Sequence, residues 1–236
     1  SRCFLELGGN DPLIIFDDVD LDTAVTEAIN GRIVHAGQAC CSSKRFIVQE
    51  NIYDEFAGRL AERLKGMKIG DPLDQGSRIG PLIDERAAQR VEEIVDRTVK
   101  AGAYCLCGGR RFDGNFFEPT VLTGVTPAMD IAQNLEVFGP VFPLIKFKTE
   151  EQAIAIADNC TYGLSSGVIS GEIQRAIRVA RQLDAGNCTI NGTGLYRTHD
   201  MPFGGHRKSG LGTEGLYATL DEFTKTKTYV WKGAAI

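Results

Sequence analysis

Residues 36–43 read Ala-Gly-Gln-Ala-Cys-Cys-Ser-Ser. They follow a segment with apolar residues at helical spacing and precede the apolar run 46–48, Phe-Ile-Val, so a turn of small residues is predicted between a helix and a strand. A thiol on such a turn can face a cleft. Because a free cysteine is mostly protonated at neutral pH, Cys40 or Cys41 needs a lowered pKa or a nearby base to act as a nucleophile.

A candidate base, Glu6, lies 34 positions before Cys40, in residues 5–10, which read Leu-Glu-Leu-Gly-Gly-Asn. A carboxyl group between two leucines is unusual, and burial there would raise its pKa toward the range of a general base. Each feature alone has a plainer interpretation. An isolated cysteine is more often a small buried apolar residue, and a glutamate near a Gly-Gly turn is more often on the surface.

The composition is that of an ordinary globular protein, with 236 residues, 43% hydrophobic and 24% charged, and a net charge of −5. Acidic and basic residues are interspersed, so no basic stripe indicates nucleic acid. No apolar run approaches the roughly 20 residues that cross a bilayer. Seven cysteines without a repeating spacing argue against a disulfide framework and favour a reducing, cytoplasmic setting. Three histidines and a poor half-site at 105–107 argue against a metal centre.

Short apolar runs alternate along the chain with segments whose apolar residues recur at helical spacing. The predicted strands cover residues 12–16, 45–49, 104–107, 116–125, 142–147, 167–170, 187–191 and 224–231. The predicted helices cover residues 21–34, 51–67, 84–99, 149–157 and 172–183. This alternation predicts an α/β fold with a mainly parallel, twisted sheet flanked by helices. Sites in such sheets are expected at the carboxyl ends of strands, where the Gly-rich loop 191–215 begins.

The two segments resemble the active-site signatures of the aldehyde dehydrogenase superfamily, a Glu-Leu-Gly-Gly box and a Gly-Gln-x-Cys box, and their separation fits that family. Two further boxes follow in order. Residues 136–141, Glu-Val-Phe-Gly-Pro-Val, resemble the third signature. Residues 202–210 resemble a Pro-Phe-Gly-Gly-x-Lys-x-Ser-Gly box, with Arg207 in place of the usual lysine. The joint order and spacing of four boxes over nearly the whole chain is specific.

The resemblance assigns roles to individual residues. It implies that Cys40, the second residue after Gln38, is the nucleophile and that Glu6 is the general base. The other implied site residues are Glu136, Phe138 and Leu7 at the cofactor and Phe203, Cys41 and Ala39 at the substrate pocket, with no metal. The implied reaction oxidises a small-molecule aldehyde to a carboxylic acid with NAD or NADP, through a thiohemiacetal and a thioester on Cys40. The implied assembly is a homodimer or homotetramer.

In the family a dinucleotide-binding domain precedes the glutamate box. The resemblance therefore implies that residues 1–222 are the catalytic domain, with 1–10 as the end of that dinucleotide-binding domain. Residues 223–236 are then an oligomerisation strand and tail. By this interpretation the chain is the C-terminal half of an aldehyde dehydrogenase, its cofactor site is incomplete, and it is expected to be inactive alone.

Other functions remain open from the residues. Cys40 could serve a thiol esterase with His35 as its base, or the chain could be a non-catalytic scaffold that pairs through the predicted edge strand 224–231. An acylating enzyme that passes the thioester to coenzyme A is disfavoured, because such members usually lack the base that Glu6 supplies. Arg197 or His199 could indicate an acidic or aromatic aldehyde. The aldehyde itself, and the choice between NAD and NADP, are not predicted.

Overall fold

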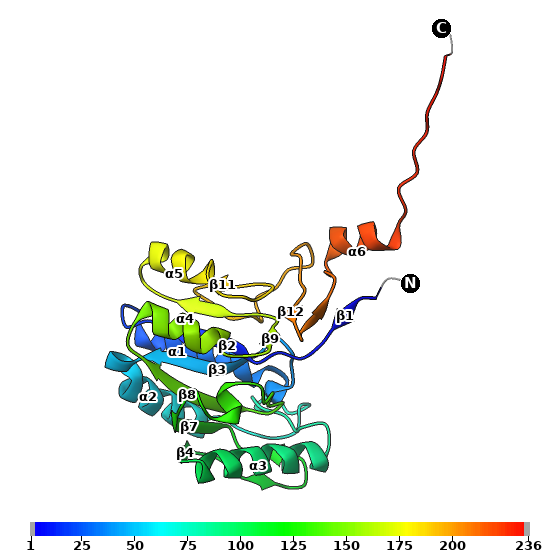
Figure 1. Cartoon of the computed structure of the whole chain (residues 1–236). Helices are drawn as coiled ribbons and strands as arrows, with labels where there is room; N and C mark the ends of the chain where they lie inside the picture. The colour runs from blue at the N-terminus through cyan, green and yellow to red at the C-terminus, as the bar shows by residue number, and fades with distance from the viewer. Residues whose placement is uncertain (1–2, 234–236) are drawn as a thin grey trace.

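A seven-stranded sheet runs through the centre of the protein (Figure 1). The computed structural model describes residues 3–233, so the outer ends of the predicted domains 1–222 and 223–236 lie outside the described residues. In spatial order the strands are β11 (Thr189–Ile190), β10 (Gly167–Ile169), β2 (Asp11–Ile15), β3 (Ser43–Gln49), β8 (Val141–Phe147), β7 (Thr120–Val125) and β4 (Tyr104–Cys107). All neighbours are parallel except β4, which pairs with β7 antiparallel. The predicted α/β fold with a mainly parallel sheet is confirmed.

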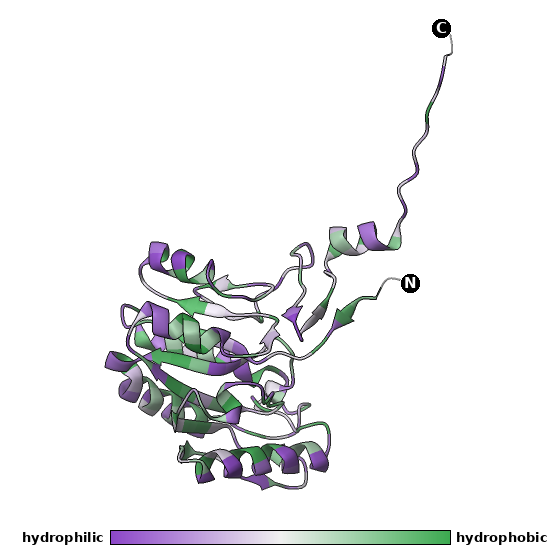
Figure 2. Cartoon of the chain, viewed as in Figure 1, coloured by the Kyte–Doolittle hydropathy of each residue, from purple (hydrophilic) through white to green (hydrophobic). Residues whose placement is uncertain are grey.

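Five helices flank the sheet, and all five were predicted. They are α1 (Leu21–Ile33), α2 (Tyr53–Lys65), α3 (Glu85–Lys100), α4 (Glu150–Asp158) and α5 (Ile173–Ala180). Three of them begin after a residue whose side chain accepts a hydrogen bond from a first-turn backbone N–H: Asp20, Asp84 and Thr149. Figure 2 shows hydrophobic residues concentrated in the sheet and hydrophilic residues on the outer sides of the helices, most clearly along α3.

The core is built on the central strands. Leu13, Ile14 and Ile15 are consecutive in β2 and all are fully buried, so both faces of this strand are covered. The rings of Phe46 on β3 and Phe142 on β8 lie 5.1 Å apart. This packing fixes the relative positions of the turns at the ends of the strands, and the candidate site is built on those turns.

The site residues lie at the edge of the sheet where the strands begin. Cys40 lies shortly before β3, Glu136 before β8, and Glu6 before β2. The expectation that the site collects at the carboxyl ends of strands is therefore wrong for these three residues. The reason is topological, because the turns that carry Cys40 and Glu136, and the short strand β1 that carries Glu6, lead into sheet strands and so lie at the amino ends of those strands.

The C-terminal segment also differs from the prediction. A helix that was not predicted, α6 (Leu216–Phe223), follows the Gly-rich loop. The predicted strand 224–231, part of the predicted oligomerisation segment 223–236, is not formed within the described chain. A strand needs a neighbouring backbone to pair with, and this segment projects away from the body (Figure 1). Its side chains are exposed, Trp231 by 85%.

Small two-stranded sheets and 3-10 turns complete the fold. The pairs are β1 (Leu5–Glu6) with β13 (Gly210–Leu211), β9 (Tyr162–Gly163) with β12 (His206–Arg207), and β5 (Arg111–Phe112) with β6 (Phe116–Phe117). The turns are η1 (Val34–Gly37), η2 (Glu50–Ile52) and η3 (Asp130–Ala132). The pairs β1–β13 and β9–β12 each join segments that are far apart in the sequence, and both help to build the site.

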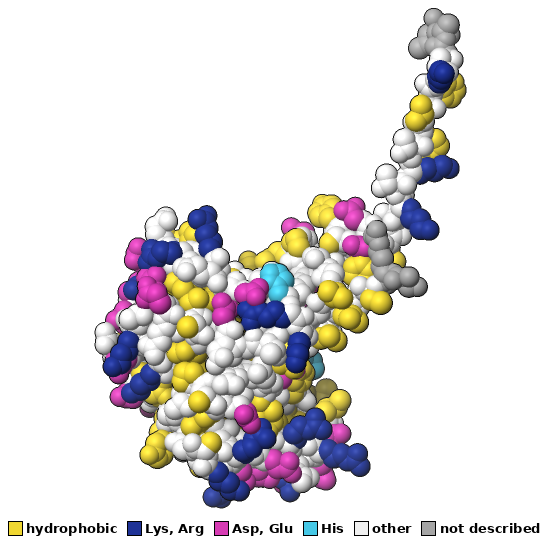
Figure 3. All heavy atoms as spheres, in the orientation of Figure 1, with side chains coloured by type: hydrophobic (Ala, Val, Ile, Leu, Met, Phe, Trp, Pro, Cys, Tyr) yellow, Lys and Arg dark blue, Asp and Glu magenta, His cyan; other side chains and the backbone are white. Residues whose placement is uncertain are grey.

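Acidic and basic side chains are interspersed over the face of the body that Figure 3 shows. Hydrophobic side chains are also visible around the base of the projecting C-terminal segment. None of the helices in residues 3–233 combines the length and the hydropathy that crossing a bilayer requires. The same part of the chain contains no group of three or more His, Cys, Asp or Glu residues arranged to hold a metal ion.

Candidate active site

The turn that carries Cys40 and Cys41, here called the cysteine turn, follows a sharply bent connection after α1. His35 and Ala36 both have a φ of 54° and Gly37 has a φ of 78°, so three consecutive residues are left-handed. A Cβ at Gly37 would meet the carbonyl oxygen of Gly139 at 2.3 Å, so only glycine fits there. The two non-glycine residues cost roughly 1 to 2 kcal/mol each in this conformation. Contacts with other parts of the protein must therefore stabilise His35 and Ala36 in the left-handed conformation.

Arg32 holds this bend from inside the protein. Its side chain is fully buried on α1. Nη2 donates to Val137 O at 2.8 Å, Nε to Val141 O at 2.9 Å, and Nη1 to Ser42 Oγ at 2.6 Å. One guanidinium group therefore ties the cysteine turn to the segment that carries Glu136.

The strand pair β1–β13 brings Glu6 to the cysteine turn. Glu6 pairs with Gly210, and the N–H of Leu7 donates to Ser209 O at 2.9 Å. The Sγ atom of Cys40 consequently lies 3.9 Å from Oε2 of Glu6. The two residues that the sequence singled out, 34 positions apart, face each other.

Glu6 is exposed overall, in contrast to the burial expected from its two leucine neighbours. Leu5 and Leu7 are themselves 43% and 47% exposed. The carboxyl group is still partly withdrawn from water against Cys40. This partial burial, and after it the negative charge of the Cys40 thiolate, raise the pKa of Glu6 to about 7. A carboxyl group with that pKa can accept a proton near neutral pH.

The two neighbouring thiols differ in their ionisation. A hydrogen bond from the Cys41 thiol lowers the pKa of Cys40 to about 6, and the positive charge of Lys44 adds to this effect, while burial opposes it. Backbone N–H groups of Cys41 and Cys40 also stabilise the thiolate. The pKa of Cys41 is raised, because its thiol donates to Cys40 and is buried. Cys40 is therefore the thiolate of the pair and Cys41 the thiol.

Glu136 lies before β8, beside the Gly8-Gly9 turn. Its Oε1 atom accepts a hydrogen bond from the Gly9 N–H at 2.8 Å and lies 3.3 Å from Lys44 Nζ. Within residues 3–233 no group donates a hydrogen bond to Oε2, and the side chain is 18% exposed. The protein thus holds one oxygen of this carboxylate and leaves the other available to a hydroxyl group.

These residues fit the ribose end of a nicotinamide cofactor. A carboxylate oxygen accepts a strong hydrogen bond from a sugar hydroxyl. Phe138, two residues after Glu136, is 40% exposed, and the Lys44 ammonium lies 5.4 Å from the centre of its ring. Leu7, the third predicted cofactor residue, is also partly exposed. The apolar surfaces of Phe138 and Leu7 suit the flat faces of a ribose and a nicotinamide ring.

Phe203, a predicted pocket residue, lies beneath another side chain. It is 2% exposed, and the Arg197 guanidinium lies 4.1 Å from the centre of its ring. Arg197 pairs with Glu214 Oε1 at 2.5 Å and borders a groove of about 680 Å³ next to α6. The guanidinium, rather than the phenyl ring, therefore faces outward here. Ala39 and Cys41, the other predicted pocket residues, are half-buried in the cysteine turn.

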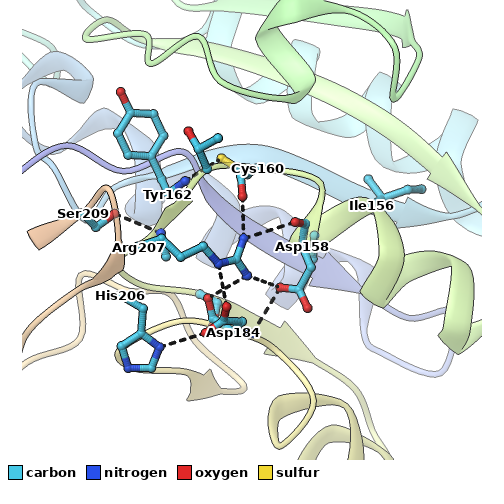
Figure 4. A network of polar contacts seen from close by, with 12 residues as sticks. Ile156, Asp158, Cys160, Tyr162, Asp184, His206, Arg207 and Ser209 are labelled. Atoms are coloured by element: carbon cyan, nitrogen blue, oxygen red, sulfur yellow. Dashed lines mark hydrogen bonds and ion pairs between the residues drawn. The ribbon is translucent and has the colours of Figure 1, made fainter.

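A polar network fixes the Gly-rich loop to the body (Figure 4). Arg207 Nε and His206 Nδ1 contact the two carboxylate oxygens of Asp184, at 2.5 and 2.9 Å. Arg207 Nη1 also donates to the backbone oxygens of Asp158, at 3.2 Å, and Cys160. Arg207 stands where the resembled family usually has lysine, and its fork reaches all of these acceptors at once.

The same loop positions the candidate base. Ser209 Oγ accepts a hydrogen bond from the Gly163 N–H at 2.9 Å. Ser209 O accepts from Leu7, and Gly210 pairs with Glu6. The network around Asp184 therefore contributes to holding β1 against the cysteine turn.

Three buried cations in this region were not predicted. Arg32, Lys44 and Arg45 are each at most 1% exposed. Arg45 Nε donates to Asn10 O at 2.6 Å, and its Nη2 donates to Ala157 O at 2.7 Å. The sequence held a signal for all three, because Arg32 falls on the apolar face of its helix and the other two adjoin the apolar run of β3.

His35, the alternative base, makes no hydrogen bond with the Cys40 side chain in the part of the chain that the structure describes. Its backbone oxygen accepts from Gln38 Nε2 at 2.9 Å, and the residue is exposed. Cys40 contacts Glu6 instead. The geometry favours the carboxyl group over the imidazole as the base.

Together these features define a class of protein: an α/β domain with a thiolate facing a carboxyl group and a second carboxylate suited to a sugar hydroxyl. A family model described as the aldehyde dehydrogenase family matches residues 1–229. The chain belongs to this family. The predicted resemblance is confirmed.

Two curated relatives and one solved structure illustrate the similarity. The chain is 43% identical to a glutarate-semialdehyde dehydrogenase of Pseudomonas putida, covering 96% of this chain and 47% of that protein. It is also 43% identical to a succinate-semialdehyde dehydrogenase [NADP(+)] of Deinococcus radiodurans, covering 96% of this chain and 48% of that protein. The structure of a betaine aldehyde dehydrogenase of Staphylococcus aureus in complex with NAD+ aligns with a TM-score of 0.90 at 40% identity. The alignment covers 93% of this chain and 44% of that one. The chain spans about half the length of these relatives.

Proposed function

We propose that the full-length protein is an NAD(P)-dependent aldehyde dehydrogenase that oxidises an aldehyde to a carboxylic acid, with Cys40 as nucleophile and Glu6 as general base. The observation that carries the proposal is the 3.9 Å contact between Cys40 Sγ and Glu6 Oε2. The lowered pKa of Cys40 and the raised pKa of Glu6 suit these roles. The relatives named above are dehydrogenases of aldehydes; the name of one of them gives NADP(+), and another is a complex with NAD+.

In the proposed reaction the Cys40 thiolate forms a C–S bond with the aldehyde carbon, and the carbonyl electron pair moves to oxygen. The backbone N–H of Cys40 donates to this oxyanion. Accepting a hydride from that carbon is the chemistry that NAD or NADP supplies when it is bound, held by Glu136, Phe138 and Leu7. Cys40 then carries the acyl group as a thioester. Glu6 then removes a proton from a water molecule, and the water oxygen bonds to the acyl carbon. The C–S bond breaks, Cys40 returns to the thiolate, and the carboxylic acid leaves.

We expect the chain alone to bind the cofactor weakly and to sustain no turnover. Glu136 and Phe138 hold only the ribose end of a dinucleotide. The exposed apolar side chains of α6 and the segment after it support a homodimer or homotetramer, since such surface is often covered by a partner. The seven cysteines are all free, which suits a reducing, cytoplasmic setting.

The test compares Cys40→Ala, Cys41→Ala and Glu6→Gln in the full-length protein, assayed with a panel of aldehydes and either cofactor. Cys40→Ala should abolish turnover, and Cys41→Ala should retain it. Glu6→Gln should still release a first equivalent of reduced cofactor but hydrolyse the thioester slowly. An active Cys40→Ala variant beside an inactive Cys41→Ala variant would refute the assignment. A Cys40 that iodoacetamide labels no faster than the other thiols would favour the scaffold.

A further inference from the structure

Lys44 lies directly beneath the nucleophile turn. Its side chain is 1% exposed, and its Nζ atom lies 2.6 Å from Cys40 O, 3.0 Å from Ala39 O and 3.3 Å from Glu136 Oε1. We propose that Lys44 is a positioning residue, whose ammonium group fixes the Cys40 turn and the Glu136 carboxylate against each other. One buried cation would then set both the thiol and the ribose-binding oxygen. This inference rests on the proposed function.

The first step in the argument is the geometry of the peptide groups. A trans peptide is planar, and its C=O and N–H point in opposite directions. Lys44 draws the carbonyl oxygens of Ala39 and Cys40 toward itself, so the N–H groups of Cys40 and Cys41, in the same two peptides, point away from it. These are the two backbone N–H groups that stabilise the Cys40 thiolate. Lys44 therefore orients the backbone N–H groups of Cys40 and Cys41 toward the positions of the sulfur and the oxyanion.

The second step is the charge balance around the sulfur. The ionisable groups that face Cys40 are Glu6, Cys41, Asp11 and Lys44. Asp11 is fully buried, and burial raises its pKa to about 8. This raised pKa disfavours the carboxylate form of Asp11, so Asp11 adds little negative charge beside the sulfur and the lysine ammonium. A positive charge this close favours the thiolate.

The third step concerns the cofactor carboxylate. A buried ammonium is costly unless it is paired and hydrogen-bonded, and Glu136 Oε1 supplies the pairing charge. The same oxygen accepts from the Gly9 N–H at 2.8 Å. With Oε1 fixed in this way, Oε2 keeps a defined position for a ribose hydroxyl. Loss of the lysine would release the carboxylate and the turn together.

The test uses the full-length protein. In Lys44→Met an apolar side chain of similar length removes the charge. The pH midpoint for alkylation of Cys40 by iodoacetamide, measured without cofactor by mass spectrometry of the Cys40 peptide, should rise by about one unit. The dissociation constant of the NAD(P)+ that the protein uses should rise about tenfold, as for one lost hydrogen bond. Lys148→Met, which removes a lysine whose side chain is 70% exposed, should change neither quantity. A folded Lys44→Met protein with an unchanged midpoint overturns the inference.

A second variant keeps the inference testable if Lys44→Met does not fold. Glu136→Gln retains the lysine and its contacts with the carbonyl oxygens of Ala39, Cys40 and Ser42, so it should weaken cofactor binding without raising the alkylation midpoint. An unchanged or lower midpoint supports the inference, and a higher one overturns it. If Cys40 of the unsubstituted protein titrates like an ordinary thiol, the proposed nucleophile is refuted instead, so the two failures can be told apart.

Discussion

Replacing Gly8 by alanine should separate cofactor binding from folding. A Cβ at Gly8 would lie 2.2 Å from Glu136 Oε2, whereas ordinary contact begins near 3.4 Å, so the carboxylate must move by about 1.2 Å. The obstructing atom is the tip of a flexible side chain, and Gly8 does not have a left-handed φ, so the backbone can stay in place. The movement is large enough to displace the oxygen that faces the ribose and to disturb the 2.8 Å bond from the Gly9 N–H.

A charge-assisted hydrogen bond contributes roughly 1.5 to 3 kcal/mol, so the dissociation constant of the cofactor should rise about 10- to 150-fold. Fluorescence titration of the full-length Gly8→Ala protein with NAD+ and NADP+ measures this directly. The melting temperature should stay within a few degrees of the unsubstituted protein. Gly58→Ala is the matched control, because a Cβ there meets nothing within 4 Å and alanine favours the helix. Unchanged cofactor affinity in Gly8→Ala, or its loss in Gly58→Ala, would refute the reasoning.

Three further outcomes are expected of the full-length protein. Arg32→Met removes the arginine donor from four buried acceptors, so urea titration should show a free energy of unfolding lowered by about 3 to 5 kcal/mol. Glu6 acts as a base in its deprotonated form and has a pKa raised to about 7, so the rate of thioester hydrolysis, followed by stopped flow, should climb with pH up to about 7 and then level off. Cys41→Ala removes the principal donor to the Cys40 thiolate, so the alkylation midpoint of Cys40 should move upward from about 6.

The sheet and five of its helices were predictable because their signals are local. Residues 12–16 form an uninterrupted apolar run that only a strand covered on both faces explains. The proximity of Glu6 and Cys40 was predictable from the family resemblance, because two motifs at the spacing typical of the family imply that their residues share one site. The helix α6 (Leu216–Phe223) has apolar residues at helical spacing, but it follows a Gly-rich loop and its large hydrophobic side chains stay exposed in this chain.

The hydrogen-bond partners of the buried cations, and the absence of a strand at 224–231, could not be derived from local signals. Arg32 and Lys44 are held by carbonyl oxygens, and every residue has a carbonyl oxygen, so nothing in the sequence marks the acceptors. Residues 224–231 have a strand-like composition, but pairing depends on a second backbone that is not beside them in this chain. The left-handed conformation of His35 and Ala36 was equally hard to predict, since few non-glycine residues adopt it and alanine has no preference for it.

The pairing of β1 with β13 has a consequence for biosynthesis. Glu6 is aligned by Gly210, which is translated 170 residues after Cys40. At about 5 to 20 residues per second, the ribosome needs roughly 10 to 30 s to cover that interval. Throughout this time the nascent cysteine lacks the strand contact that brings its carboxyl partner into place. The contact between Cys40 and Glu6 is thus held by its strand pairing only after residue 210 has been made.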